Sequence, residues 1–186
     1  MKEDLRVIKT RSAIEGAFTS LVEEKGFENV KIIDIAKRAN VNRNTIYLHY
    51  DSKEMIIESL VDKIFSQEVT TFDVETYLKA KNSRRKIYEM FLKVFEIIEG
   101  NIEIYRIILT DQNLTGYLTF KINKLKTLIL SILKPTLRNE VTVEYVVFGV
   151  VGIIRNWIVY DKGSVEENVN LIAELVSINM RRIQYR

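Results

Sequence analysis

The sequence predicts an all-α fold, in which a three-helix helix-turn-helix domain (residues 1–52) is followed by a larger helical domain (residues 53–186). The chain of 186 residues contains one proline and seven glycines, so few positions interrupt a helix. Apolar residues recur at intervals of three and four along most of the chain, which is the helical period. Residues 32–50 have the pattern of two short helices joined by a sharp turn, a helix-turn-helix unit.

The second short helix, expected over residues 43–49, begins after Asn42, a residue type preferred at helix N-caps. Ile46 and Tyr50 lie four residues apart on one side and would face the core. The residues left outside all carry hydrogen-bonding groups: Arg43, Asn44, Thr45, Tyr47 and His49. Such a face fits a recognition helix that enters the major groove of DNA. The alternative is a helical hairpin with an ordinary solvated face.

The first short helix, over residues 32–39, is followed by Asn40, where the chain must turn. Asparagine tolerates the left-handed backbone conformation better than any residue other than glycine. Upstream, residues 9–25 form a helix whose apolar stripe would pack on the two short helices, and Gly26 ends it. The stripe consists of Ile14, Ala17, Phe18, Leu21 and Val22.

Two runs in this region carry a resemblance to a known family. They are FENVKIIDIA at residues 27–36 and NRNTIYLHYDSK at residues 42–53. In order and spacing they resemble the N-terminal domain of TetR/AcrR-family transcriptional regulators, over about residues 9–60. The resemblance is greatest to the subgroup that includes regulators of dihydroxyacetone kinase genes. Two residues depart from the family pattern: Lys31 stands in place of the usual threonine cap, and Asn40 in place of the common turn glycine.

This resemblance implies a homodimeric regulator that binds a palindromic operator in double-stranded DNA, as a repressor released by a small-molecule effector. Arg43 is expected to read a guanine. Asn44 or Thr45 would contact a neighbouring base, and Leu48 a thymine methyl group. Phosphate contacts are expected from Tyr47, His49, Lys53 and Lys31. The full set of predicted DNA-binding residues is Lys31, Asn42, Arg43, Asn44, Thr45, Tyr47, Leu48, His49 and Lys53.

Charge alone does not predict DNA binding, because the net charge is only +3 and residues 1–60 hold equal numbers of basic and acidic side chains. Affinity would depend on where the basic side chains lie. Those expected on one side are Lys9, Arg11, Lys31, Arg43 and Lys53. For Lys9 and Arg11, plain solvation is an equally good interpretation.

Downstream of a helix at about residues 53–70 and a connector at residues 72–83, the pattern predicts several further helices. Residues 141–160 are apolar on nearly every side, which is more than one domain can easily bury, and Gly149 and Gly152 would let another backbone come close. We therefore expect the last two helices of two subunits to form a four-helix interface. Its expected residues are Val147, Val151, Ile154, Ile172 and Val176. A larger core within one subunit is the alternative.

Aromatic residues of the second half could line an effector pocket between helices. The predicted lining is Tyr88, Phe91, Phe95, Tyr105 and Trp157. Aromatic residues at helical spacing are also typical of plain core. Some members of the resembled subgroup answer to protein partners, so a protein could take the place of the small molecule.

Enzymatic chemistry has little support in the sequence. There is no cysteine and His49 is the only histidine, which disfavours thiolate chemistry, histidine-based metal sites and catalytic triads. We predict no catalytic residue, metal or cofactor. The longest uncharged apolar stretch, residues 145–154, is shorter than a membrane span requires, which indicates a cytoplasmic protein without membrane contact. The competing class of function is a helical ligand-binding or adaptor module acting through a protein partner.

Overall fold

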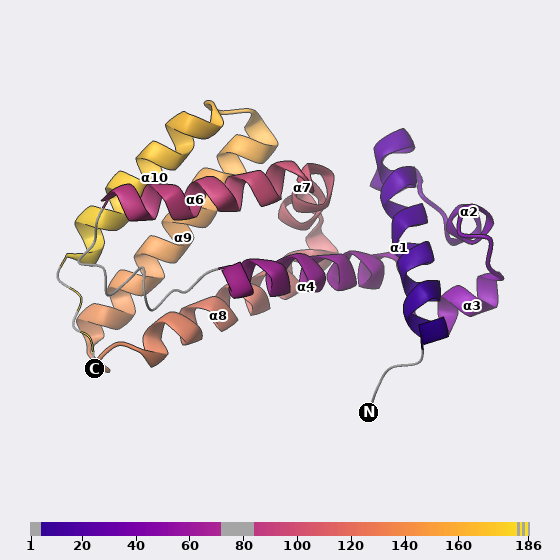
Figure 1. Ribbon diagram of the computed structural model, residues 1–186, viewed down its shortest axis with the longest axis horizontal. Coiled ribbons are helices and arrows are strands. Elements are labelled where there is room, and N and C mark those ends of the chain that lie inside the picture. The colour runs from indigo at the N-terminus through magenta and orange to yellow at the C-terminus, as the bar shows by residue number, and fades with distance from the viewer. Residues whose placement is uncertain (1–4, 72–83, 182, 184, 186) are drawn as a thin grey trace. The chain divides into compact units, whose positions relative to one another are not determined.

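The computed structural model describes residues 5–71, 84–181, 183 and 185 (Figure 1). These residues form helices and turns, with one isolated bridge between Leu133 and Tyr185. The all-α prediction is therefore confirmed. Contacts along the chain divide it into two compact units, Met1–Ile64 and Phe65–Arg186. The connector predicted at residues 72–83 lies outside the described residues.

The N-terminal unit is built from short helices around one long one. Its elements are α1 (Leu5–Lys25), the 3-10 turn η1 (Phe27–Asn29), α2 (Ile32–Arg38), α3 (Arg43–Tyr47) and the first part of α4 (Lys53–Thr71). Helix α1 packs against α2 and η1, and α2 packs against α3 (Figure 1). The predicted apolar stripe of α1 is buried throughout, so it supplies the platform for the two short helices.

Two left-handed residues shape the turns of this unit, and both were expected from the sequence. Gly26 ends α1 with φ of 75°, and Asn40 follows α2 with φ of 53°. At the second turn the Val41 N–H donates to the carbonyl oxygen of Ala36 at 3.0 Å. This bond closes the end of α2 and aims the chain into α3.

The N-terminal unit continues past the predicted domain boundary, which falls at the first residue of α4. Ser52 caps this helix, since its Oγ accepts from the Met55 N–H at 3.4 Å. Further along α4, Ser59 and Lys63 both bind the carboxylate of Glu15 in α1. These ties explain why the start of α4 belongs to the N-terminal unit.

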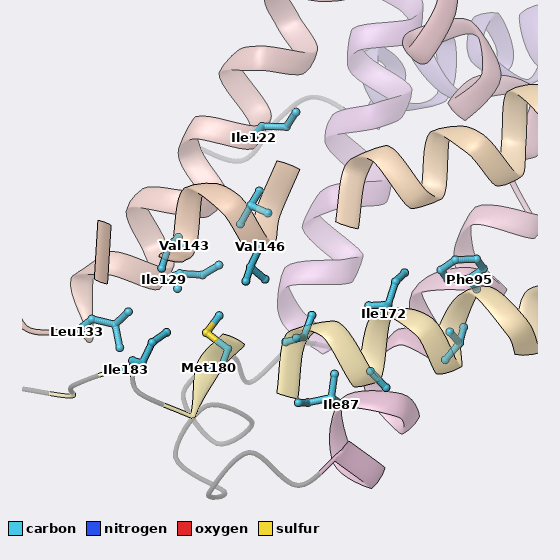
Figure 2. Close-up of a cluster of buried hydrophobic side chains, with 14 residues drawn as sticks. Ile87, Phe95, Ile122, Ile129, Leu133, Val143, Val146, Ile172, Met180 and Ile183 are labelled. Atoms are coloured by element: carbon cyan, nitrogen blue, oxygen red, sulfur yellow. The ribbon is translucent and has the colours of Figure 1, made fainter. Parts of the chain in front are cut away.

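The C-terminal unit is a bundle of helices around one apolar core (Figure 2). Its elements are α6 (Arg84–Glu99), α7 (Ile102–Thr110), η2 (Gln112–Leu114), α8 (Thr115–Ser131), α9 (Leu137–Tyr160) and α10 (Val165–Met180). Helix α10 packs against α6 and α9, and α9 packs against α7 and α8. The core draws on α6, α8, α9 and α10 together.

Helix α9 is apolar over most of its length, as the sequence predicted. Among the described residues it is the one helix long and apolar enough to cross a membrane, a test that the core helix of a soluble protein also passes. It ends at Tyr160 because Asp161 takes the left-handed conformation, φ 52°. A capping box begins α10, with Ser164 and Glu167 bonded to each other's backbone N–H.

Candidate nucleic-acid interface

The segment after the α2–α3 turn has a buried side and an exposed side, as predicted. Asn42 caps α3, its Oδ1 accepting from the Asn44 N–H at 2.9 Å. Ile46 and Tyr50 are buried, and Val41 is half-buried beside them. Because these buried side chains anchor the segment to the core, the residues between them are held in fixed positions on the surface.

The exposed side chains of this segment form what we call the reading face. It consists of Asn42, Arg43, Asn44, Tyr47 and Leu48. Leu48 is 81% exposed, so its side chain is accessible to a binding partner. Thr45 and His49, also predicted to contact DNA, are half-buried.

Arg43 and Tyr47 are paired on the reading face. The Arg43 guanidinium donates to the Tyr47 hydroxyl at 3.1 Å and lies 5.4 Å from the centre of its ring. The two residues are one helical turn apart, so the contact costs little conformational freedom. It holds the guanidinium extended along α3, with further N–H donors left for a base or a phosphate.

Helix α3 is shorter than the expected range of residues 43–49. It ends at Tyr47, and Leu48 is its C-cap. The His49 N–H then donates to the carbonyl oxygen of Ile46 at 2.9 Å, a bond three residues back that tightens the last turn. His49 therefore lies beyond the helix rather than on it.

Lys31 stands at the start of α2 with an exposed side chain. An ammonium group cannot accept a hydrogen bond, so it cannot replace the threonine cap. The Asp34 N–H, which a threonine oxygen would cap, donates instead to the backbone carbonyl oxygen of Lys31 at 2.9 Å, and Asp34 Oδ2 accepts from the Lys31 N–H at 3.3 Å. Lys25 donates to the same oxygen at 2.6 Å, and this hydrogen bond lowers the pKa of the Asp34 carboxyl. The Lys31 ammonium is not needed for the cap.

Lys53, predicted to bind a phosphate, also has a structural role. Its Nζ donates to the carbonyl oxygen of Phe27 at 3.0 Å and lies 4.0 Å from the centre of that ring. This explains a cation in the first turn of α4, where the helix dipole disfavours one. The remaining ammonium donors leave a phosphate contact open.

Two further residues of α1 take roles that the sequence did not show. Arg11, expected at the DNA side, lies half-buried and donates to Tyr50 and Ser59. Glu15 is buried on the same helix and accepts from the same two residues. The helical period had given no reason to place a carboxylate inside. The only sequence feature that could have indicated the burial of Glu15 was its position next to Ile14 in the apolar stripe.

Comparison with known proteins decides the family. Residues 17–60 match the family model described as bacterial regulatory proteins, tetR family, and residues 85–178 match one described as transcriptional regulator C-terminal region. The chain belongs to the TetR family. The resemblance and the predicted class of function, transcription regulation, are therefore confirmed.

Curated relatives of this TetR-family chain are regulators. The chain is 34% identical over 61 residues to the uncharacterized HTH-type transcriptional regulator YxbF of Bacillus subtilis, covering 32% of the chain and 16% of the relative. It is 29% identical over 96 residues to the biofilm operon icaADBC negative transcriptional regulator IcaR of Staphylococcus epidermidis, covering 50% and 49%. The alignments thus span about half or less of these relatives.

Solved structures share the fold along nearly the whole chain. NalD of Pseudomonas aeruginosa, the secondary repressor of the MexAB-OprM multidrug efflux pump, superposes with a TM-score of 0.67 at 16% identity and covers 95% of this chain and 96% of its own. The dihydroxyacetone kinase operon activator DhaS superposes with a TM-score of 0.65 at 18% identity, covering 95% and 99%. At these identities the likeness shows the fold alone, so the subgroup stays a prediction.

The aromatic residues predicted for an effector pocket lie in or against the core of the C-terminal unit. Phe95 is fully buried and stacks on Trp157, with ring centres 4.5 Å apart. Tyr88 and Phe91 pack partly buried against the same core, and Tyr105 is half-buried on α7. One core thus brings together Phe95, Trp157, Tyr88 and Phe91. This arrangement fits both the pocket and the plain-core interpretation.

The residues predicted for the dimer interface do not all reach the surface. Val147, Ile172 and Val176 are buried in the core of their own subunit, and Ile172 has 0% exposure, so these three have little or no surface to offer a partner. Val151 and Ile154 are half-buried. The reason is that α9 and α10 use these sides to pack on α6, α7, α8 and each other.

Other sides of α9 and α10 carry exposed apolar side chains, which together we call the outer face. Its residues are Val141, Tyr145, Phe148, Leu171, Leu175 and Ile178. Within each helix these residues recur at intervals of three and four. Helix α9 also carries the exposed Gly149 and Gly152, and a Cβ added at either position would meet nothing within 4 Å. Sequence periodicity indicated apolar sides on both helices but could not tell which of these sides the subunit itself covers.

Proposed function

We propose that the chain is a homodimeric TetR-family regulator that binds a palindromic operator in double-stranded DNA, acting in the cytoplasm as a repressor. The observation that carries the proposal is the reading face: donors, acceptors and one apolar side chain held outward by buried Ile46 and Tyr50. Arg43 would read guanine, and Asn44 a neighbouring base. Lys31, Tyr47, His49 and Lys53 would contact phosphates.

Dimerisation in this proposal uses the outer face of α9 and α10. Tyr145 is 65% exposed and Ile178 is 51% exposed, and exposed apolar patches mark interaction sites when they are contiguous. In its most apolar 18-residue stretch, α9 is only 22% buried within the subunit. A second copy would cover this surface, with Gly149 and Gly152 allowing close approach of the two helices.

A two-fold symmetric dimer would present two copies of α3 to adjacent major grooves. Recognition helices of such dimers bind half-sites about one helical turn of DNA apart. A small molecule bound in the C-terminal unit, among the residues around Phe95 and Trp157, would release the DNA by favouring a subunit arrangement in which the two helices no longer match the operator. A protein partner in place of the small molecule is the second candidate.

The test is selection of bound sequences from random duplex DNA with the purified chain. The proposal expects enrichment of a palindrome whose half-sites lie about one turn apart. Binding should fall steeply as salt rises, because phosphate contacts release counterions. A helical adaptor without DNA use would enrich no sequence, and that result would refute the proposal.

A further inference from the structure

Glu15 is the buried acidic residue of the N-terminal unit that the reading face does not use. Its side chain lies in the middle of α1 with 4% exposure. Oε1 accepts from the Tyr50 hydroxyl at 2.8 Å and from Ser59 Oγ at 2.9 Å. Oε2 forms an ion pair with Lys63 of α4. Both oxygens of a buried carboxylate are thus bonded, which is the condition for keeping it charged inside a protein.

Arg11 extends these contacts into one network. Its Nε donates to the Tyr50 hydroxyl at 3.3 Å and its Nη2 donates to Ser59 Oγ at 3.1 Å. Its guanidinium also lies 5.7 Å from the centre of the Tyr50 ring. We call Arg11, Glu15, Tyr50, Ser59 and Lys63 the polar clamp. The clamp joins three parts of the unit: α1, α4 and Tyr50, which follows α3 and its C-cap.

Tyr50 connects the polar clamp to the reading face through the backbone. Its N–H donates to the carbonyl oxygen of Ile46 at 2.9 Å, and the side chain of Ile46 is the buried contact of α3. Tyr47, Leu48 and His49 lie between these two residues. A displacement of the Tyr50 ring would therefore move the C-terminal end of α3 and the side chains beside it.

We propose that Glu15 is a positioning residue for DNA recognition, which holds the C-terminal end of α3 against α1 and α4 through the Tyr50 hydroxyl. Glu15 touches no DNA in this proposal; it narrows the range of positions that the reading face adopts. The inference rests on the proposed DNA-binding function. Hydrogen bonds to a charged acceptor are stronger than neutral ones, so this contact restricts the segment more than a neutral pair would.

The test compares Tyr50→Phe and Glu15→Gln with the unmodified chain, using the duplex recovered by selection and an unrelated duplex. Tyr50→Phe keeps the ring in the core and removes one hydroxyl. We expect each variant to bind the selected duplex about tenfold to a hundredfold more weakly, the effect of one hydrogen bond to a charged group. Binding to the unrelated duplex and the slope of affinity against salt should not change, because no phosphate contact is lost.

Thr19→Val is the matched control. Its hydroxyl donates to the backbone oxygen of Glu15 at 3.1 Å, in the same helix, but does not reach Tyr50. This variant should bind the selected duplex like the unmodified chain. Circular dichroism at the temperature of the binding assay confirms that every variant is folded. If Glu15→Gln does not fold, Tyr50→Phe alone decides.

Two outcomes would overturn the inference. A merely structural role predicts a lower melting temperature with unchanged affinity for the selected duplex. Losses that add in the double variant would show that Glu15 and Tyr50 act separately, whereas one shared contact predicts a double variant no weaker than Glu15→Gln. Failure of the proposed function looks different, because the unmodified chain would then enrich no duplex before any variant is made.

Discussion

Some side chains of the N-terminal unit have positions that follow from the local sequence, and others have positions that depend on partners far along the chain. Asn42, Ile46 and Tyr50 were placed correctly from spacing and residue type, because a cap and an apolar repeat depend on neighbours in sequence. Arg11 and Glu15 were not, since their partners lie between 35 and 48 residues away. A periodic pattern places charged residues outside and contains no information on such tertiary bonds.

Lys53 gives a prediction at this scale. Lys53→Met keeps an unbranched side chain over the Phe27 ring and removes the ammonium group. We expect weaker binding to all duplexes alike and a decrease of about one in the slope of affinity against salt, the effect of one lost phosphate contact. Titrations of the selected and the unrelated duplex at several salt concentrations measure both. A loss confined to the selected duplex would contradict the phosphate role.

Glu15 gives a prediction on pH. Burial raises the pKa of its carboxyl, but the hydrogen bonds from Lys63, Tyr50 and Ser59 outweigh burial and set it below the ordinary 4.5. A lowered pKa in the folded state stabilises the fold above pH 4.5, and this contribution is lost as pH falls through the folded-state value.

Glu15→Gln removes that titration. Its free energy of unfolding should therefore decline less steeply than that of the unmodified chain as pH falls below 4.5. Denaturant unfolding at a series of pH values measures the slope. Equal slopes for the two proteins would show that Glu15 is not the group responsible.

At the scale of elements, the turn between α2 and α3 sets the direction of the recognition helix. The sequence predicted this turn, because few residue types accept the left-handed conformation that Asn40 adopts. It did not predict the end of α3 at Tyr47, because the bond from His49 to Ile46 depends on how Tyr50 enters the core. The ends of helices are thus set by packing as much as by local sequence.

Asn40 gives the prediction at this scale. Asn40→Ala should lower the free energy of unfolding by about 1 kcal/mol, since a Cβ without a compensating side-chain contact is strained at φ 53°. Asn40→Gly, the common residue of the family, should be at least as stable as the unmodified chain. Thermal unfolding of the three proteins ranks them, and an alanine variant as stable as the glycine variant would contradict the turn's role.

The whole molecule combines a DNA-binding unit with a C-terminal unit that exposes apolar surface which its own helices do not cover. The sequence predicted that α9 carries more apolar surface than one subunit buries, and the exposed outer face agrees with this. Which residues form that surface could not be predicted, because α9 is apolar on both sides and only the packing of α6, α7, α8 and α10 distinguishes them.

Tyr145→Glu tests the outer face. A charge on this face should weaken self-association about tenfold or more, because a buried carboxylate would lack a partner. Phe120→Glu is the matched control, since Phe120 is exposed to a similar degree, 59%, but lies on α8. Sedimentation over a range of concentrations measures association. Equal association of both variants with the unmodified chain would contradict an interface at this face.

Effector coupling has a built-in probe, because Trp157 is the single tryptophan of the chain and stacks on Phe95. A small molecule that releases the selected duplex should change the tryptophan emission at the same concentrations. Phe95→Leu should change by the same factor the effector concentrations at which the duplex is released and the tryptophan emission changes. Release of DNA with unchanged emission would place the effector elsewhere.

The central claim is that side chains of the reading face distinguish base pairs. The most direct measurement is the affinity of the unmodified chain and of Arg43→Ala for the selected duplex carrying each single base-pair change. We predict that Arg43→Ala loses about 1–3 kcal/mol on the selected duplex and no longer discriminates at one guanine in each half-site, while the other positions keep their ranking. An unchanged affinity with an unchanged pattern of discrimination would contradict the account.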